Sequence, residues 1–252
     1  MNSKVRESSK QSEADQAQFE ATEEMFNKSS GQFGDKIDAF SKFASRQAIA
    51  KFLTKYELFK RILSVNGSIV ECGVLHGGGI FTWAKLSSIL EPINHTRKII
   101  GFDTFSGFPK IHEKDQGIGQ SNHTKQGGLS GSSVDEILEV VGLYDLNRPL
   151  NHINKIELVA GDISDTAQDY MERNPHLVVS LLYLDLDLFE PTKAAVEAFL
   201  PRMPKGAIIV FDQLNAETFP GETIAVDELM GIRNMRIERF SFDSYVSFAV
   251  LA

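Results

Sequence analysis

Cysteine, long apolar runs and basic charge are scarce in this sequence, and each shortage excludes a class of protein. Cys72 is the only cysteine, which excludes an intrachain disulfide and a cysteine-based zinc site; we expect it to be a buried structural thiol. No run approaches the roughly 18 apolar residues that a membrane-spanning helix needs, and the N-terminal residues lack the apolar core of a signal peptide. We therefore expect a cytoplasmic protein that does not associate with membranes.

The charge balance of the chain is acidic. The formal net charge is −8 and the isoelectric point is about 5.3. This balance argues against sequence-independent binding to nucleic acid, whose phosphates need basic partners. With 252 residues, of which 42% are hydrophobic and 24% charged, the chain has the composition of a globular protein with a substantial core. A small or anionic ligand would need local basic groups, backbone amides or a metal ion.

The N-terminal segment differs in composition from the rest of the chain. Residues 1–38 are polar and rich in Ser, Gln and Glu. Two interpretations remain open: a mobile tail, or an arm whose apolar residues dock on the domain or on a neighbouring subunit. These apolar residues are Phe19, Met25 and Phe26. Between Phe43 and Ile62, apolar residues recur at three- and four-residue spacing, which predicts a helix. We therefore expect a polar arm, 1–38, and one domain, 39–252.

Beyond this helix, predicted strands and helices alternate. The strand candidates are 68–74, 98–105, 155–163, 178–187 and 206–214, and helical stretches lie near 78–90, 133–143, 164–173, 190–202 and 222–231. Several of the strands are continuous apolar runs, as in a parallel sheet covered on both faces. Two last strands, 235–242 and 245–252, are separated by a tight turn. The expected fold is α/β: a doubly wound, mostly parallel, seven-stranded Rossmann-like sheet with a C-terminal antiparallel hairpin and an N-terminal helical extension.

One predicted loop is unusually long. Residues 109–133 follow the second strand and are polar and rich in Gly and Ser. Loops of this length in compact domains are usually functional or disordered. We interpret its His112 and His123 as solvated loop histidines rather than metal ligands.

Acidic residues and glycines gather where the predicted strands end. The stretch LLYLDLDLFEPT begins as a buried strand and then carries Asp185 and Asp187, and a buried carboxylate is costly unless it has a partner. The other strands end in Glu71 with Gly73, in Asp103, in Asp162, and in Asp212 with Gln213. Ligands bind beyond the carboxyl ends of strands in an open parallel sheet. We therefore interpret these residues as the lining of one shared cleft.

The glycine pattern after the first strand does not match a nucleotide-phosphate site. It reads E-x-G-x-x-x-G-G-G from Glu71 to Gly79, without the second close glycine of G-x-G-x-x-G and without a P-loop lysine. An acidic residue in this place disfavours a pyrophosphate and favours a cation. S-adenosylmethionine carries a sulfonium and an ammonium group. Its ribose also suits Asp103, because an acid at that strand end commonly accepts ribose hydroxyls.

Several of these segments resemble a known family. The stretches VECGVLHGG, GFDTFSGFP, LDLDLFEPTKA and FDQLNAETFPGE are similar to segments of class I S-adenosylmethionine-dependent methyltransferases, specifically the macrocin O-methyltransferase family of sugar O-methyltransferases. Within that family the chain looks nearest to nucleotide-deoxysugar (TDP-rhamnose-type) O-methyltransferases. The resemblance implies S-adenosyl-L-methionine as the cofactor, a small sugar or nucleotide-sugar as the substrate, and a homo-oligomer.

The resemblance also implies roles for individual residues at the cofactor. Glu71 and Gly73 would hold its amino-acid end, Asp103 would hold the ribose, and Asp162 would lie by the adenine. The implied cofactor-binding set also includes Gly77, Thr104, Phe105, Gly161 and Asp185.

A magnesium ion on the acceptor side is implied in the same way. The family commonly holds a divalent cation with an aspartate after the fourth strand and an acidic pair after the fifth, and the matching residues here are Asp185, Asp212 and Gln213. Gln213 departs from the second acid; its amide oxygen can bind magnesium, but with less charge. Asp185 or Asp187 would be the general base that takes the proton of the sugar hydroxyl.

Three other functions compete with sugar O-methylation. A catechol or phenol O-methyltransferase would use the same metal, but the lysine that often assists the catechol enzymes is replaced by Leu188. A non-catalytic S-adenosylmethionine-binding protein would not need acids on the acceptor side. A nucleic-acid methyltransferase is disfavoured by the net charge and by the missing N/D-P-P-Y/F signature. The prediction is an O-methyltransferase for a sugar or nucleotide-sugar (deoxyhexose) hydroxyl in a natural-product or glycan pathway.

Overall fold

The computed structural model describes residues 12–117 and 123–252, and the chain divides into two compact units, Met1–Leu53 and Thr54–Ala252. The first unit contains α1 (Glu13–Lys28), α2 (Phe33–Asp38), the 3₁₀ turn η2 (Phe40–Lys42) and the start of α3 (Arg46–Ile62). Ser12 begins α1 with a capping box, in which its hydroxyl accepts from the backbone N–H of Asp15. None of the residues in α1 or α2 is buried, so these helices have no apolar core of their own.

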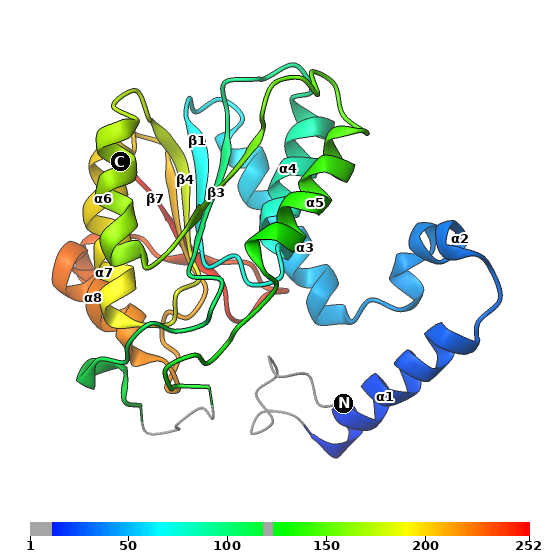
Figure 1. The fold of residues 1–252 in the computed structure, drawn as a ribbon. Helices are drawn as coiled ribbons and strands as arrows, with labels where there is room; N and C mark the ends of the chain where they lie inside the picture. Colours follow the sequence, from blue (N-terminus) through cyan, green and yellow to red (C-terminus); the bar gives the residue numbers. More distant parts are fainter. Residues whose placement is uncertain (1–11, 118–122) are drawn as a thin grey trace. The chain divides into compact units, whose positions relative to one another are not determined.

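The second unit is built on one seven-stranded sheet (Figure 1). Its strands are β1 (Ser68–Cys72), β2 (Ile99–Asp103), β3 (Ile156–Ala160), β4 (Val179–Leu184), β5 (Ile208–Phe211), β6 (Glu238–Arg239) and β7 (Ser247–Val250). They lie in the order β3-β2-β1-β4-β5-β7-β6. The first five strands pair in parallel, and β7 is antiparallel to both β5 and β6. The predicted fold class is confirmed.

Helices cover both faces of the sheet, as Figure 1 shows. They are α4 (Gly78–Leu90), α5 (Val134–Asp145), α6 (Ile163–Arg173), α7 (Phe189–Phe199) and α8 (Pro220–Met230), with 3₁₀ turns η3 (Glu113–Asp115), η4 (Leu200–Arg202) and η5 (Ile232–Asn234). One apolar core joins the sheet to α3, α4 and α5, and the other joins it to α6, α7 and α8. Cys72 is buried in the second core, as predicted. Among the helices of the described residues, none combines the length and the apolar character needed to cross a bilayer.

The C-terminal antiparallel pair has a longer connection than the predicted tight turn. Residues 240–246 separate the two strands, because the Asp243 side chain closes a loop within this segment. One carboxylate oxygen of Asp243 accepts from the backbone N–H groups of Tyr245 and Val246, and the other accepts from the Thr54 hydroxyl at 2.7 Å. These bonds use backbone donors that a tight hairpin would have paired across the strands.

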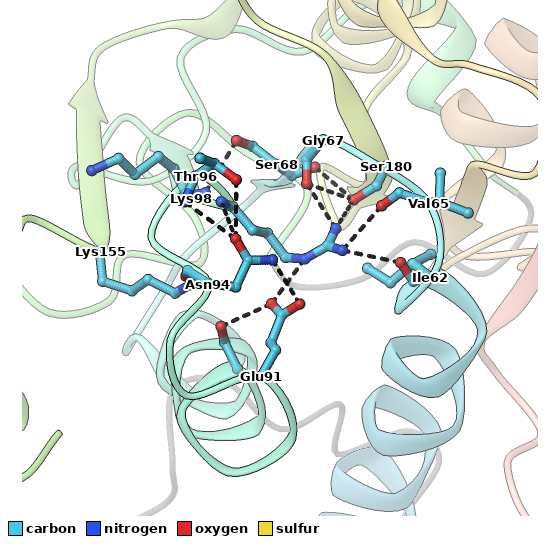
Figure 2. Close-up of polar contacts among 12 residues, drawn as sticks. Ile62, Val65, Gly67, Ser68, Glu91, Asn94, Thr96, Lys98, Lys155 and Ser180 are labelled. Atoms are coloured by element: carbon cyan, nitrogen blue, oxygen red, sulfur yellow. Dashed lines mark hydrogen bonds and ion pairs between the residues drawn. The ribbon is translucent and has the colours of Figure 1, made fainter. Parts of the chain in front are cut away.

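The buried Arg97 ties together several elements near the starts of the strands, and Figure 2 labels its partners, which include Ile62, Val65 and Ser180. Its guanidinium donates to the carbonyl oxygens of Ile62, Val65 and Gly67, to the Ser180 hydroxyl and to the Glu91 carboxylate. These five bonds use all five N–H donors of the side chain. A buried charge is tolerated when it is paired and fully hydrogen-bonded. Arg97 therefore joins the starts of β1, β2 and β4.

Candidate active site

A cleft lies beyond the carboxyl ends of β1 to β4. The strand ends are joined by backbone bonds that continue the sheet: Gly161 donates to Asp103, Gly73 to Phe102, and Asp185 to Cys72, at 2.8–2.9 Å. The cleft is lined by seven residues predicted for the site, namely Gly73, Asp103, Thr104, Gly161, Asp162, Asp185 and Asp187. The cleft therefore lies at the switch point between β1 and β4, where the sequence analysis expects the lining of a ligand site.

The cleft is acidic and otherwise mostly apolar. Asp103, Asp162, Asp185 and Asp187 are its charged lining residues, and no Lys, Arg or His occurs in the described lining. The apolar walls come from Leu75, Phe102, Phe108, Pro109, Leu129, Ile163, Leu186, Leu188 and Pro191. Such a lining suits a ligand with a flat apolar part and positive charge, and it disfavours a phosphate.

Asp103 accepts backbone hydrogen bonds from the segments that follow β1 and β2. One carboxylate oxygen accepts from the N–H groups of Val74 and Leu75 at 2.7 and 2.9 Å, and the other accepts from Phe105 at 2.7 Å. The side chain therefore fixes the loop after β1 to the end of β2. A carboxylate has about four lone-pair sites, so one remains for a hydroxyl in the cleft. Phe105, next to it, packs on the apolar core and lies outside the cleft lining.

Position 73 requires a glycine for a steric reason that the sequence did not reveal. Its φ is +97°, and a Cβ atom there would lie 1.9 Å from the carbonyl oxygen of Asp185. The ends of β1 and β4 therefore approach too closely for any side chain. Gly77 has φ +80° at the start of α4 and lies outside the cleft lining.

Asp185 and Asp187 follow β4 in different conformations. Asp185 is half-buried in the cleft, whereas Asp187 is buried and has a φ of +62°. Leu75 and Leu129, which also line the cleft, have similar positive φ values of 52° and 51°. Such conformations are costly for residues with side chains and tend to concentrate at functional sites.

Glu71 lies beneath the first turn of α4, outside the cleft lining. It is buried, accepts from the indole N–H of Trp83, and lies 3.6 Å from the Lys55 ammonium group. A Cβ atom at Gly79 would collide with its carboxylate, so this glycine makes room for Glu71. Burial raises the pKa of Glu71, and the Lys55 charge opposes that rise.

Asp212 and Gln213 follow β5, beside the end of β4. Leu184 pairs with Phe211, so Asp185 and Asp212 are the next residues on adjacent strands, as predicted. Asp212 is buried; its Oδ1 accepts from the Tyr183 hydroxyl at 2.6 Å, and its Oδ2 lies 3.4 Å from the Gln213 amide nitrogen.

Glu222, in the first turn of α8, is a buried acid that the sequence reading missed. Its Oε1 accepts from the Gln213 backbone N–H at 2.9 Å. Burial, followed by the charge of Asp212, raises its pKa well above the usual range. Asp187 and Asp185 raise this pKa as well, so three acids at the ends of β4 and β5 act on Glu222.

The fit of a magnesium ion to these residues is partial. The oxygen donors are of the type that magnesium prefers. Among the described residues, however, no three Asp, Glu, His or Cys side chains are arranged as a metal site. Both carboxylate oxygens of Asp212 face donors of the protein, and the Gln213 amide nitrogen is turned toward Asp212.

The long loop after β2 is anchored over the start of α7. Asp115 is buried; its Oδ1 accepts from the Phe189 backbone N–H at 2.6 Å, and its Oδ2 accepts from the His112 N–H at 2.8 Å. The His112 ring packs on Phe189, with centroids 5.2 Å apart, so this histidine is a packing residue. Residues 118–122 of the predicted loop lie outside the described chain. Phe108, Pro109 and Leu129 carry the anchored parts of the loop into the cleft wall.

The strand order and the acidic cleft at the switch point define a Rossmann-like methyltransferase fold. Three solved methyltransferase structures share it. The calicheamicin methyltransferase CalS11 superposes with a TM-score of 0.90, at 30% identity, over 95% of this chain and 93% of that one. An apo structure of CalS11, a TDP-rhamnose 3′-O-methyltransferase of calicheamicin biosynthesis, gives 0.82 at 28% identity, over 95% of each chain. The O-methyltransferase NovP gives 0.64 at 20% identity, over 81% of this chain and 80% of that one, and shows the fold alone.

The sequence profile of the macrocin O-methyltransferase (TylF) family matches residues 11–246. The chain therefore belongs to this family, and the predicted resemblance is confirmed. A curated relative from Streptomyces olivaceus is the 8-demethyl-8-(2,3-dimethoxy-α-L-rhamnosyl)-tetracenomycin-C 4′-O-methyltransferase, which is 27% identical over 153 residues. That match covers 59% of this chain and 53% of the relative, so the chain spans about half the length of the curated relative.

Proposed function

We propose that this protein transfers the methyl group of S-adenosylmethionine to a hydroxyl of a sugar or nucleotide-sugar of the deoxyhexose type. The observation that carries the proposal is the cleft at the β1–β4 switch point, whose charged lining residues are four aspartates. A sulfonium and an ammonium group are stabilised by such a lining, whereas a dinucleotide pyrophosphate is not. The named activities of the tetracenomycin relative and of CalS11, both rhamnose O-methylations, support the acceptor class.

Within the cleft, the ends of successive strands provide distinct contacts for the cofactor. Asp103 and Thr104 would bind the ribose, since one acceptor site of the Asp103 carboxylate remains after its three backbone bonds. Gly161 and Asp162 would lie by the adenine, with Ile163 and Leu188 as apolar walls. Gly73 and Asp185 would be nearest to the amino-acid end and the sulfonium.

Asp185 would take the proton of the acceptor hydroxyl. Asp185 is half-buried in the cleft lining, and Asp212 is the corresponding residue after the next strand. A sugar hydroxyl is a poor nucleophile until its proton is removed, and a positioned carboxylate can accept that proton as the oxygen attacks the sulfonium methyl in line. Asp187 is the second candidate for the general base. Its positive φ of 62° distinguishes its backbone conformation from that of Asp185.

Magnesium remains part of the proposal on the basis of donor chemistry alone. Asp185, Asp212 and the amide oxygen of Gln213 would be its protein ligands. A bound magnesium ion would supply Lewis-acid stabilisation of the acceptor oxygen.

A labelled-methyl transfer screen tests the proposed function. The full chain is incubated with methyl-labelled S-adenosylmethionine and a panel of nucleotide deoxyhexoses, rhamnosides, catechols and phenols, with and without magnesium. We expect label in a deoxyhexose acceptor. Label only in a catechol or phenol would overturn the acceptor class, and cofactor binding without transfer to any acceptor would indicate a binding protein.

Asp103→Ala tests the cofactor site independently of the acceptor. We expect the affinity for S-adenosylmethionine, measured by calorimetry, to fall about 10- to 100-fold, which corresponds to the roughly 1–3 kcal/mol of a lost charge-assisted hydrogen bond. The melting temperature should fall as well, because three backbone N–H groups lose their acceptor.

Asp243→Ala is the matched control for that loss of stability. Asp243 also accepts three hydrogen bonds, from Thr54, Tyr245 and Val246, and lies outside the cleft lining. This variant should melt earlier with unchanged cofactor affinity. If both variants bind the cofactor as the wild type does, Asp103 does not belong to the site.

A further inference from the structure

Tyr183 is a buried tyrosine in the middle of the sheet, next to the proposed site but outside the described cleft lining. It lies in β4, and in the sheet it pairs with Glu71 of β1 and Val210 of β5. Its hydroxyl donates to Asp212 Oδ1 at 2.6 Å, and both residues are 2% exposed. The phenol thus links the interior of the sheet to the acid that follows β5.

The ring of Tyr183 packs against the ammonium group of the buried Lys55. The Lys55 ammonium group of α3 lies 3.4 Å from the Tyr183 ring centroid and 4.7 Å from that of Trp83. Trp83 packs edge-on against Tyr183, with centroids 6.0 Å apart. The ammonium group also pairs with Glu71, 3.6 Å away. A desolvated cation over an aromatic face is attracted to it, so Lys55 and Trp83 restrict the position of the phenol.

The hydrogen bond from Tyr183 sets the orientation of the Asp212 carboxylate. A carboxylate can rotate about its Cβ–Cγ bond, and a charge-assisted hydrogen bond from a fixed donor sets that rotation. With Oδ1 on Tyr183, Oδ2 is the oxygen that remains on the side of Gln213, 3.4 Å from its amide nitrogen. Asp185, on the adjacent strand, is the next residue in register with Asp212.

We propose that Tyr183 is a positioning residue for methyl transfer, which sets the Asp212 carboxylate beside Asp185 through its hydroxyl and is itself held by Lys55, Glu71 and Trp83. The inference rests on the proposed function. Tyr183 lies outside the described cleft lining, so we expect it to act through Asp212.

Tyr183→Phe tests the inference because it removes only the hydroxyl and keeps the ring under Lys55. We expect kcat for methyl transfer to fall about 10- to 100-fold, the scale for a small displacement of groups at a catalytic site. The KM of the acceptor should change less than kcat, and calorimetry should show cofactor affinity within about threefold of the wild type, because no cleft-lining group is altered.

Tyr170→Phe is the matched control for a purely structural role. The Tyr170 hydroxyl of α6 donates to Glu157 of β3 at 2.7 Å, and neither residue lines the cleft. This variant loses the same type of phenol–carboxylate bond, so its melting temperature should fall while kcat is unchanged.

A double-mutant cycle with Asp212→Asn separates action through Asp212 from a direct effect. If Tyr183 acts only by positioning that carboxylate, Tyr183→Phe should add no further loss to Asp212→Asn. A fully additive double mutant, or a Tyr183→Phe protein with wild-type kcat in an active enzyme, overturns the inference and leaves the proposed function intact. A wild type that methylates no acceptor overturns both.

Discussion

Asp185→Asn is expected to lower kcat for methyl transfer by about 10²- to 10⁴-fold, the range for loss of a general base. The amide keeps the size of the side chain but accepts no proton at neutral pH. Cofactor affinity should remain within a few-fold of the wild type, because Asp103, Asp162 and Asp187 still line the cleft. Single-turnover methyl transfer and calorimetry measure the two quantities separately.

Asp187→Asn is the matched comparison, two residues further along the same cleft wall. Asparagine tolerates the positive φ of 62° at this position, so the backbone should be preserved. We expect a smaller loss of kcat than for Asp185→Asn. If the two effects are reversed, Asp187 is the base; if both variants keep wild-type turnover, the catalytic assignment fails.

Chelation with EDTA separates the metal part of the proposal from the base. A magnesium-dependent enzyme should lose turnover with EDTA and regain it when magnesium is added, and Asp212→Asn should behave like the chelated wild type. Full activity in EDTA, together with an inactive Asp185→Asn, would leave a metal-free general base. That result would agree with the hydrogen bonds that Tyr183 and Gln213 make to Asp212.

The strands, the helices and the fold class could be predicted because their signals are local. A mostly apolar run such as 178–184 is typical of a strand buried on both faces, and the helix predicted over 78–90 begins and ends where α4 does. The C-terminal connection could not be predicted, because Asp243 closes it through a bond to Thr54, which lies 189 residues away in the sequence. Pattern reading detects periodicity and turns, and it contains no information about such distant partners.

The cleft was predictable for a similar reason, since parallel strands bring their carboxyl ends to one edge. Asp103, Asp162, Asp185 and Asp187 do line it. Position in sequence does not fix side-chain direction, however. Glu71 lies beneath α4 because its neighbours in space are Trp83 and Lys55.

The buried pair of Lys55 and Glu71 carried a weak signal in the sequence. Lys55 interrupts the apolar face of the helix that starts the second unit, and Glu71 interrupts an apolar strand. Two opposite charges on two buried faces suggest an ion pair, because burying either charge without a partner would destabilise the fold. Tyr183 and Glu222 gave no comparable signal, since a tyrosine in a strand and a glutamate in the first turn of a helix are both ordinary.

Gly73→Ala is expected to have the largest effect on stability. The new methyl group would have to occupy a point 1.9 Å from the Asp185 carbonyl oxygen, in a backbone with φ +97°. Backbone strain costs about 1–3 kcal/mol, and displacement of a packed neighbour costs about as much again. The free energy of unfolding should therefore fall by about 3 kcal/mol or more, which corresponds to roughly 6–12 °C in the melting temperature for a chain of this size.

The same substitution should also abolish turnover in any protein that remains folded. The carbonyl that the methyl group displaces belongs to the proposed base, and the Asp185 N–H pairs with Cys72 next to it. Gly78→Ala and Gly142→Ala are the matched controls, because nothing lies within 4 Å of a Cβ atom at either position. Each should leave activity unchanged, and Gly142→Ala, within α5, should raise stability by about 0.5–1 kcal/mol. A Gly73→Ala protein with the melting temperature and turnover of the wild type would mean that the ends of β1 and β4 lie further apart, and that Asp185 is not held by this contact.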